Sequence, residues 1–210
     1  MKMMRKFFQN ARRPDKTIGG TLFLNMMNKA HFKCAMWGFS QIDVKTCHRV
    51  LDIGCGGGKN IRSIIELAPD STVCGIDYSA ASVEKSIRMN KTGIRDGRVE
   101  IREASVEAIP YESNQFDLVT AFETIYFWPD IEENFREVAR IVCKGGTFLV
   151  CNEAQRPEGN ERWLKLIDMK IYTGKEIKNA MEKAGFISVE INEHRKCKWL
   201  CVKGNRPADL

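Results

Sequence analysis

Residues 49–60 read RVLDIGCGGGKN, and this stretch predicts a buried strand, a glycine-rich turn and the start of a helix. Val50, Leu51 and Ile53 are apolar, as expected of a parallel strand that is covered on both faces. Four glycines within five positions let the backbone turn sharply and approach a ligand closely. The helix expected to begin at Asn60 directs its N-terminal amides at this turn, which favours a negatively charged group there. Such a unit is typical of the nucleotide-binding end of a doubly wound α/β sheet.

The spacing of the glycines indicates which nucleotide is bound. A dinucleotide fingerprint requires G-x-G-x-x-G, but counting from Gly54 places Lys59 at the third glycine. The chain has instead Asp52-x-Gly54-x-Gly56-x-Gly58, which resembles the first motif of the class I S-adenosylmethionine-dependent methyltransferases. A plain glycine-rich turn is the alternative interpretation of this motif taken alone.

Length and composition point to one domain with a sizeable core and a short extra segment, because the chain has 210 residues of which 43% are hydrophobic. No apolar run approaches ~18 residues, so no membrane span is expected. The start of the chain lacks the apolar region of a secretory signal. The eight cysteines are scattered without paired metal-ligand spacing, which predicts reduced thiols, no metal site and a cytoplasmic location.

The positive charge is concentrated at the N-terminus. Residues 1–16 contain six basic residues against Asp15, a net charge of +5, which leaves only +1 of the total +6 for the other 194 residues. A nucleic-acid enzyme needs a sustained basic face, so nucleic acid is not the favoured partner. These residues are interpreted as a solvated basic tail.

Residues 17–48 precede the first expected strand and predict a helix over Leu22–Trp37, in which apolar residues recur at helical spacing. His31 lies among them. A packing role for His31 is the favoured interpretation, and a polar role at a ligand cleft is the alternative.

Asp77 follows the second expected strand, Ser71–Ile76, about 20 residues beyond the glycines, where an acid can accept both ribose hydroxyls of an adenosine. Tyr78 beside it can lie against the adenine ring. The alternative for Asp77 is a helix N-cap, but Ser79 can serve that cap.

Further blocks resemble the same methyltransferase family in the expected order. Residues 104–111 resemble the stretch after the third strand that meets the adenine, although Ser105 replaces the usual aspartate. The fourth strand, Phe116–Ala121, is followed by Phe122-Glu123-Thr124-Ile125-Tyr126, and the fifth, Thr147–Cys151, follows Lys144-Gly145-Gly146. Thr173 and Glu176 predict a capping box that opens the last helix. Residues 187–191 and 196–202 predict a closing pair of strands.

The resemblance covers roughly residues 45–205. It implies a Rossmann-like seven-stranded sheet, order 3-2-1-4-5-7-6 with strand 7 antiparallel, and helices on both faces. It also divides the chain into the basic tail (1–16), an N-terminal helical lid (17–48) and a methyltransferase domain (49–210). The implied cofactor is S-adenosylmethionine, held by Asp52, Gly54, Cys55, Gly56, Asp77, Tyr78, Ser105, Val106 and Ala121.

The resemblance implies methyl transfer to a small-molecule acceptor, with Glu123, Tyr126 and His31, in that order, as candidate bases. An amine, a thiol or an acidic hydroxyl needs no base, whereas an ordinary alcohol does. Three alternatives stay open: an RNA or protein methyltransferase that uses the basic tail, a nicotinamide oxidoreductase, and a non-catalytic cofactor-binding protein.

Overall fold

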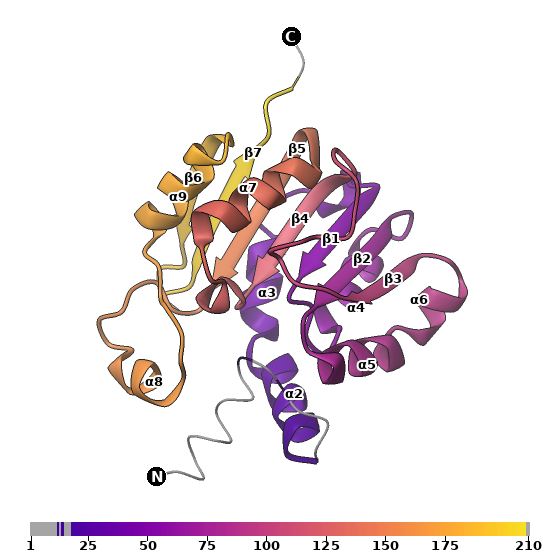
Figure 1. The fold of residues 1–210 in the computed structure, drawn as a ribbon, viewed down its shortest axis with the longest axis horizontal. Coiled ribbons are helices and arrows are strands. Elements are labelled where there is room, and N and C mark those ends of the chain that lie inside the picture. Colours follow the sequence, from indigo (N-terminus) through magenta and orange to yellow (C-terminus); the bar gives the residue numbers. More distant parts are fainter. Residues whose placement is uncertain (1–11, 13, 15–17, 209–210) are drawn as a thin grey trace.

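A computed structural model describes residues 12, 14 and 18–208 of the chain. Its centre is one seven-stranded sheet with the order β3-β2-β1-β4-β5-β7-β6 (Figure 1). β7 pairs antiparallel with both β5 and β6, whereas the other neighbours pair parallel. The predicted strand order and the reversed seventh strand are confirmed. The strands are β1 (Arg49–Ile53), β2 (Thr72–Asp77), β3 (Val99–Glu103), β4 (Phe116–Phe122), β5 (Val142–Asn152), β6 (Ile187–Glu193) and β7 (Leu200–Asn205).

Helices cover both faces of the sheet (Figure 1). Residues of α3 and α4 pack on one face, and residues of α7 and α9 pack on the other. The α-helices are α2 (Ile18–Ala30), α3 (Phe32–Phe39), α4 (Lys59–Leu67), α5 (Ala80–Met89), α6 (Lys91–Arg95), α7 (Ile131–Ile141), α8 (Glu161–Leu166) and α9 (Gly174–Lys183), and two 3-10 helices are η2 (Val44–Thr46) and η3 (Ile125–Phe127).

β1 shows why the central strands are apolar on both sides. Val50 and Leu51 are completely buried, but Val50 belongs to the core under α3 and α4, and Leu51 to the core under α7 and α9. Successive side chains of a strand point to opposite faces, so a strand between two helical layers needs apolar residues at adjacent positions.

The switch point of the fold lies between β1 and β4. β1 leads into α4 on one face, and β4 leads towards α7 on the other. The two strands are neighbours, so the chain diverges at their carboxyl ends and leaves a crevice there. In Figure 1, α2 and α8 lie beyond this edge of the sheet.

Several predicted elements differ in their bounds. The fifth strand, expected over Thr147–Cys151, is longer, because β5 (Val142–Asn152) includes the stretch Lys144-Gly145-Gly146 that was expected to precede it. The helix expected over Leu22–Trp37 is two helices, α2 and α3, because the chain turns at His31. The strand expected from residue 196 begins at Leu200, because the preceding residues form a turn in which His194 Nδ1 accepts the backbone N–H of Cys197. Lys198 has a φ of 58° in this turn, which a strand does not permit.

The capping box at the start of α9 is confirmed: the Thr173 hydroxyl accepts the Glu176 backbone N–H, and the Glu176 carboxylate accepts that of Thr173. The basic tail expected over residues 1–16 lies outside the described residues, apart from Arg12 and Pro14. All eight cysteines lie in the described part of the chain, and none of them forms a disulfide there. Within the described part of the chain, no helix combines the length and apolarity that crossing a membrane requires.

Candidate active site

The glycine-rich turn is tied to the end of β2. The backbone N–H groups of Gly54 and Cys55 both donate to the Ile76 carbonyl, at 2.8 and 3.0 Å. Gly54 has a φ of +73°, and a Cβ atom there would lie 2.2 Å from Thr124 Oγ1. Only glycine fits at residue 54, because both the backbone conformation and the approach of the segment after β4 exclude a side chain.

Gly56 differs from Gly54 in the space around the position that a Cβ atom would occupy. Its φ is +52°, and a Cβ atom there would meet no atom closer than the Gly54 carbonyl oxygen at 4.0 Å. The Gly56 N–H donates to Asp77 Oδ2 at 2.9 Å. The turn therefore leaves open space at Gly56 and fixes the Asp77 carboxylate beside it.

Asp77 is buried and held by two backbone amides, because its Oδ1 atom also accepts the Ser79 N–H at 2.8 Å. Burial raises the pKa of Asp77, while the two amides act in the opposite direction. Ser79 caps α5 as expected, by accepting the Ser82 N–H. Asp77 therefore does not serve as the N-cap, and each of its carboxylate oxygens accepts one backbone N–H and retains a second lone pair for a ligand.

A cavity of about 90 Å³ lies against the turn, and we call it the glycine-turn cavity. Its wall includes Asn28, Gly54, Gly56, Asp77, Tyr78 and Thr124. Asn28 of α2 is close to the turn, since its Nδ2 atom would lie 2.5 Å from a Cβ atom on Gly57. This Nδ2 atom is buried and has no hydrogen-bond partner among the described residues. α2 therefore narrows the cavity.

The predicted cofactor residues divide into two groups. Those in the wall of the glycine-turn cavity are Gly54, Cys55, Gly56, Asp77 and Tyr78. Those outside the wall are Asp52, Ser105, Val106 and Ala121. The side chains of the second group have other partners: Ser105 accepts the Glu107 N–H within its own loop, and Val106 packs in the core. Ala121 is fully buried within β4.

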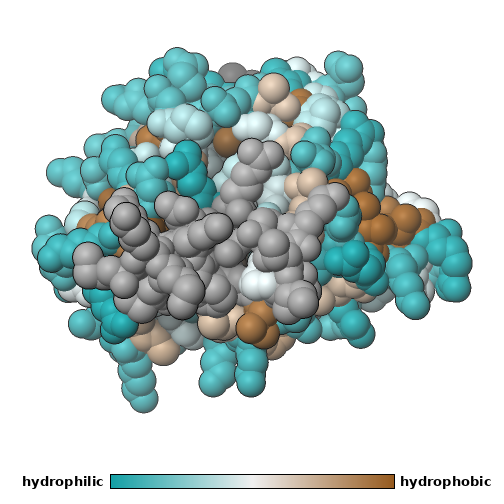
Figure 2. Space-filling model, turned by 60° about the horizontal axis from the view of Figure 1, so that its bottom comes forward, coloured by the Kyte–Doolittle hydropathy of each residue, from teal (hydrophilic) through white to brown (hydrophobic). Residues whose placement is uncertain are grey.

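A second cavity of about 400 Å³, which we call the outer cavity, is lined mainly by hydrophobic side chains. They come from α2, η3 and the segment between β5 and α9, and include Met26, Ala30, Trp163, Ile167 and Met169. Met27, His31, Glu123 and Phe127 line both cavities. Figure 2 views the molecule from the side of α2 and α8, where the visible surface is mostly hydrophilic with hydrophobic side chains in small separate groups.

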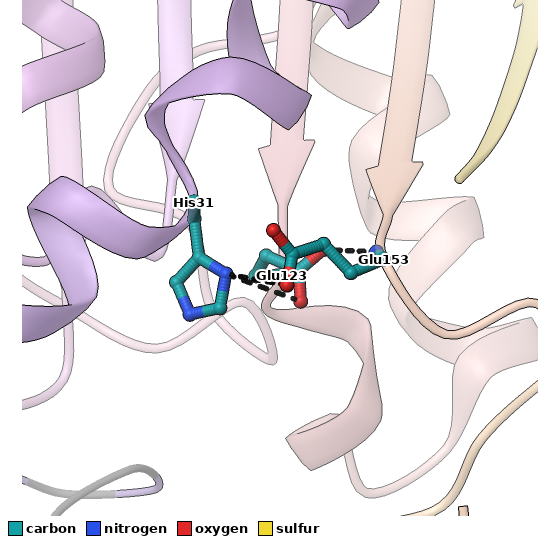
Figure 3. Close-up of side chains that lie close together, drawn as sticks. All are labelled: His31, Glu123 and Glu153. Atoms are coloured by element: carbon teal, nitrogen blue, oxygen red, sulfur yellow. Dashed lines mark hydrogen bonds and ion pairs between the residues drawn. The ribbon is translucent and has the colours of Figure 1, made fainter. Parts of the chain in front are cut away.

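Three titratable side chains converge where the two cavities meet (Figure 3). His31 Nδ1 lies 3.2 Å from Glu153 Oε2 and 3.8 Å from Glu123 Oε2. Glu123 directly follows β4 and has a φ of 58°, an uncommon conformation for this residue type. Its Oε1 atom accepts the Glu153 backbone N–H, so Glu123 and Glu153 are fixed relative to each other.

The environment shifts the pKa values of this cluster. Burial raises the pKa of Glu123 to about 7, since the nearby His31 only partly offsets the lost solvation. Burial alone would lower the pKa of His31, but Glu153 and Glu123 raise it overall. Burial also raises the pKa of Tyr126 well above its usual range. The Tyr126 hydroxyl hydrogen-bonds the Glu123 carboxylate and accepts the Ala154 N–H at 3.0 Å.

All three predicted catalytic residues line the outer cavity. Glu153 is the site residue that sequence reasoning did not select. A signal was present, because Glu153 follows the fifth strand at the same edge of the sheet as Glu123, and β4 and β5 are neighbours. Carboxylates that follow adjacent parallel strands are brought together by the sheet.

Residues 51–150 match the family model described as a methyltransferase domain. The matched segment runs from β1 into β5 and includes the glycine turn and Asp77. The matched segment makes up 100 of the 210 residues, and the strand order of the sheet agrees with the class I methyltransferase fold that the sequence resemblance implies.

The chain is similar to methyltransferase GfsG of Streptomyces halstedii, with 31% identity over 54% of this chain and 41% of that protein. It is also similar to sarcosine/dimethylglycine N-methyltransferase of Halorhodospira halochloris, with 32% identity over 52% of this chain and 40% of that one. The similarity thus spans less than half the length of these relatives. A solved chain from the Haloferax volcanii complex with the Trm112 methyltransferase activator has the same fold, with a TM-score of 0.78, 19% identity and coverage of 89% and 94%.

Proposed function

We propose that this protein transfers a methyl group from S-adenosylmethionine to a small-molecule acceptor. The observation that carries the proposal is the shared wall of the two cavities, formed by Met27, His31, Glu123 and Phe127. A cofactor on the glycine turn and an acceptor in the outer cavity would meet at this wall. Methyl transfer requires that kind of alignment, because the protein contributes mainly proximity and orientation.

The glycine-turn cavity fits an adenosyl cofactor in its chemistry. The open space at Gly56 admits a ligand close to the backbone, and the free lone pairs of Asp77 suit ribose hydroxyls. Gly54, Cys55 and Gly56 would border the methionine part, and Tyr78 the adenine. The bound cofactor supplies an electrophilic methyl group on a sulfonium.

The size of this cavity implies a movement of the protein. Ligand pockets usually enclose about 300–1,000 Å³, whereas the glycine-turn cavity holds about 90 Å³. Asn28 of α2 is the side chain nearest to Gly57. Cofactor binding therefore requires α2 to shift away from the turn.

The outer cavity supports a small acceptor with an apolar part, since hydrophobic side chains form most of its wall. The named substrates of one relative, sarcosine and dimethylglycine, are small amines, which favours a small-molecule acceptor here as well. For a nucleophile that must lose a proton, the candidate bases are Glu123, Tyr126 and His31, in that order, and all three line the outer cavity. Full turnover of both Glu123→Gln and Tyr126→Phe with intact cofactor binding would exclude these two as the base.

The decisive experiment is calorimetric titration of the full chain with S-adenosylmethionine, S-adenosylhomocysteine and NADH. We expect micromolar affinity for the adenosyl ligands and a loss of ~10-fold or more in Asp77→Ala, about 1.4 kcal/mol. Asp70→Ala removes an exposed carboxylate just before β2 and is the matched control. Absent adenosyl binding, or tighter NADH binding, would contradict the proposal.

A larger acceptor is the second candidate, because an RNA or protein methyltransferase would use the basic residues at the N-terminus. Deletion of residues 1–16 tests it: unchanged turnover on a small substrate would leave the tail without a role in acceptor binding. The cytoplasmic location stays a prediction.

A further inference from the structure

We propose that His31, Glu123 and Glu153 bind one divalent transition-metal ion at the boundary of the two cavities. The three residues offer one imidazole nitrogen and two carboxylate oxygens, and these atoms lie within 4.8 Å of one another. Imidazole suits Zn²⁺ and similar ions, whereas Mg²⁺ prefers an all-oxygen shell with several waters. Three protein ligands with a further position open is the arrangement of catalytic zinc sites.

The distances fit a common ion. Ligand bonds of about 2.1 Å, at the angles of tetrahedral or octahedral coordination, place neighbouring ligand atoms about 3.0–3.4 Å apart. His31 Nδ1 is 3.2 Å from Glu153 Oε2 and 3.8 Å from Glu123 Oε2. Figure 3 shows both carboxylates beside the edge of the imidazole ring that carries Nδ1. Small rotations of the side chains would complete the coordination.

The hydrogen bonding leaves the ligand atoms available. His31 Nδ1 is buried and forms ion pairs with Glu153 and Glu123, but within the described part of the chain neither contact has the geometry of an aligned hydrogen bond. A cation bound to Nδ1 would replace these ion-pair contacts, and it would not break an aligned hydrogen bond. An imidazole donor between two carboxylates would instead be expected to form an aligned hydrogen bond to one of them.

Glu123 is oriented as metal-binding carboxylates usually are. Its Oε1 atom accepts the Glu153 N–H, and the Tyr126 hydroxyl hydrogen-bonds the same carboxylate. Its Oε2 atom faces His31. Outer partners that fix the direction of a ligand are a general feature of metal sites, and here they come from β5 and η3.

A metal in this position would act on the acceptor, and this step rests on the proposed function. The outer cavity adjoins all three ligands, so an oxygen, nitrogen or sulfur atom of the acceptor could occupy the open position. Coordination lowers the pKa of such a group and favours its deprotonated, nucleophilic form. His31 and Glu123 would then serve as ligands and not as bases.

The test is calorimetric titration of metal-free full-length protein with Zn²⁺, Mn²⁺ and Mg²⁺, without S-adenosylmethionine. We expect one Zn²⁺ per chain with micromolar or tighter affinity, and at least ~10-fold weaker binding of Mg²⁺. His31→Gln, Glu123→Gln and Glu153→Gln should each weaken Zn²⁺ binding by ~10-fold or more. His48→Gln and Glu158→Gln change an exposed histidine and an exposed glutamate, and should leave it unchanged.

Co²⁺ absorption distinguishes these ligands from the cysteines, because a thiolate ligand adds a charge-transfer band. A thiolate band, millimolar Zn²⁺ affinity, or equal affinity in wild type and the three variants would overturn the proposal. Circular dichroism of each variant verifies that it is folded. Separate titration with S-adenosylmethionine keeps the two proposals distinct: metal binding without cofactor binding overturns only the proposed function, and the reverse overturns only the metal site.

Discussion

Asp52 Oδ1 accepts a 2.8 Å hydrogen bond from Thr120 Oγ1, whereas the other oxygen of this carboxylate is buried and has no partner among the described residues. Burial raises the pKa of Asp52 to about 7, because one hydroxyl replaces only part of the lost hydration. The nearby charge of Asp77 acts in the same direction. The ionised form of Asp52 therefore destabilises the folded state at the base of the glycine turn.

The raised pKa of Asp52 predicts how the free energy of unfolding depends on pH. The unperturbed pKa is 3.8 and the folded value about 7, so between them the folded state binds a proton that the unfolded chain lacks. The Asp52 contribution to the free energy of unfolding therefore falls as pH rises through this window and levels off above it. Asp52→Asn keeps an acceptor for Thr120 and removes the charge. Urea unfolding should show that its gain over wild type is larger at about pH 8 than at about pH 5, by on the order of 2 kcal/mol. An equal gain at both pH values would contradict this.

Gly56→Ala should reduce cofactor affinity by more than its effect on stability explains. Gly56 and Gly97 both have a positive φ, but only Gly56 lines the glycine-turn cavity. Alanine at either position should lower the free energy of unfolding by about 1 kcal/mol. Calorimetry should show weaker S-adenosylmethionine binding for Gly56→Ala and unchanged binding for Gly97→Ala. Equal affinity in both variants would place the ligand elsewhere.

Ala154→Leu should reduce activity towards the acceptor and leave cofactor binding unchanged. Ala154 lines the outer cavity alone, and its contact with Tyr126 uses the backbone N–H, which the substitution retains. The larger side chain fills part of the cavity, so kcat/KM for a small acceptor found by screening should fall by ~10-fold, about 1.4 kcal/mol. S-adenosylmethionine affinity should stay within about twofold. Ala108→Leu changes an exposed residue outside both cavities and serves as the control.

Thr173→Ala should destabilise the protein, because Thr173 is the N-cap of α9. The substitution removes the hydroxyl that accepts the Glu176 N–H and so breaks the capping box. The expected loss is about 1 kcal/mol in the free energy of unfolding. Thr173→Ser keeps the hydroxyl and should retain most of the stability. A loss of equal size in both variants would assign the effect to packing of the methyl group.

The individual strands and helices were predictable because each element carries its own local signal. β1 has adjacent apolar residues, the turn has glycines at fixed offsets, and the start of α9 has its capping pair. These signals depend on residues a few positions apart. The order of these signals along the chain resembles that of the class I methyltransferases, and the strand order of the sheet was implied by this resemblance.

The site was less predictable because it depends on contacts between distant segments. Asp77 lies beside the turn as expected, but the two amides that hold it are visible only once β1 and β2 are paired. Ser105 and Val106 were selected by their position after β3, whereas their side chains satisfy local and core contacts. Glu153 joins His31 only because the chain turns between α2 and α3.

The position of α2 has a consequence for the kinetics of the proposed methyl transfer. α2 supplies Asn28 to the glycine-turn cavity, Met26 to the outer cavity and Met27 to both. A displacement of this helix that admits the cofactor also rearranges the wall against which the acceptor packs. The cofactor and the acceptor therefore should not bind in random order. We expect a compulsory order, in which the cofactor binds first and the demethylated cofactor leaves last, so that its inhibition is competitive only with S-adenosylmethionine.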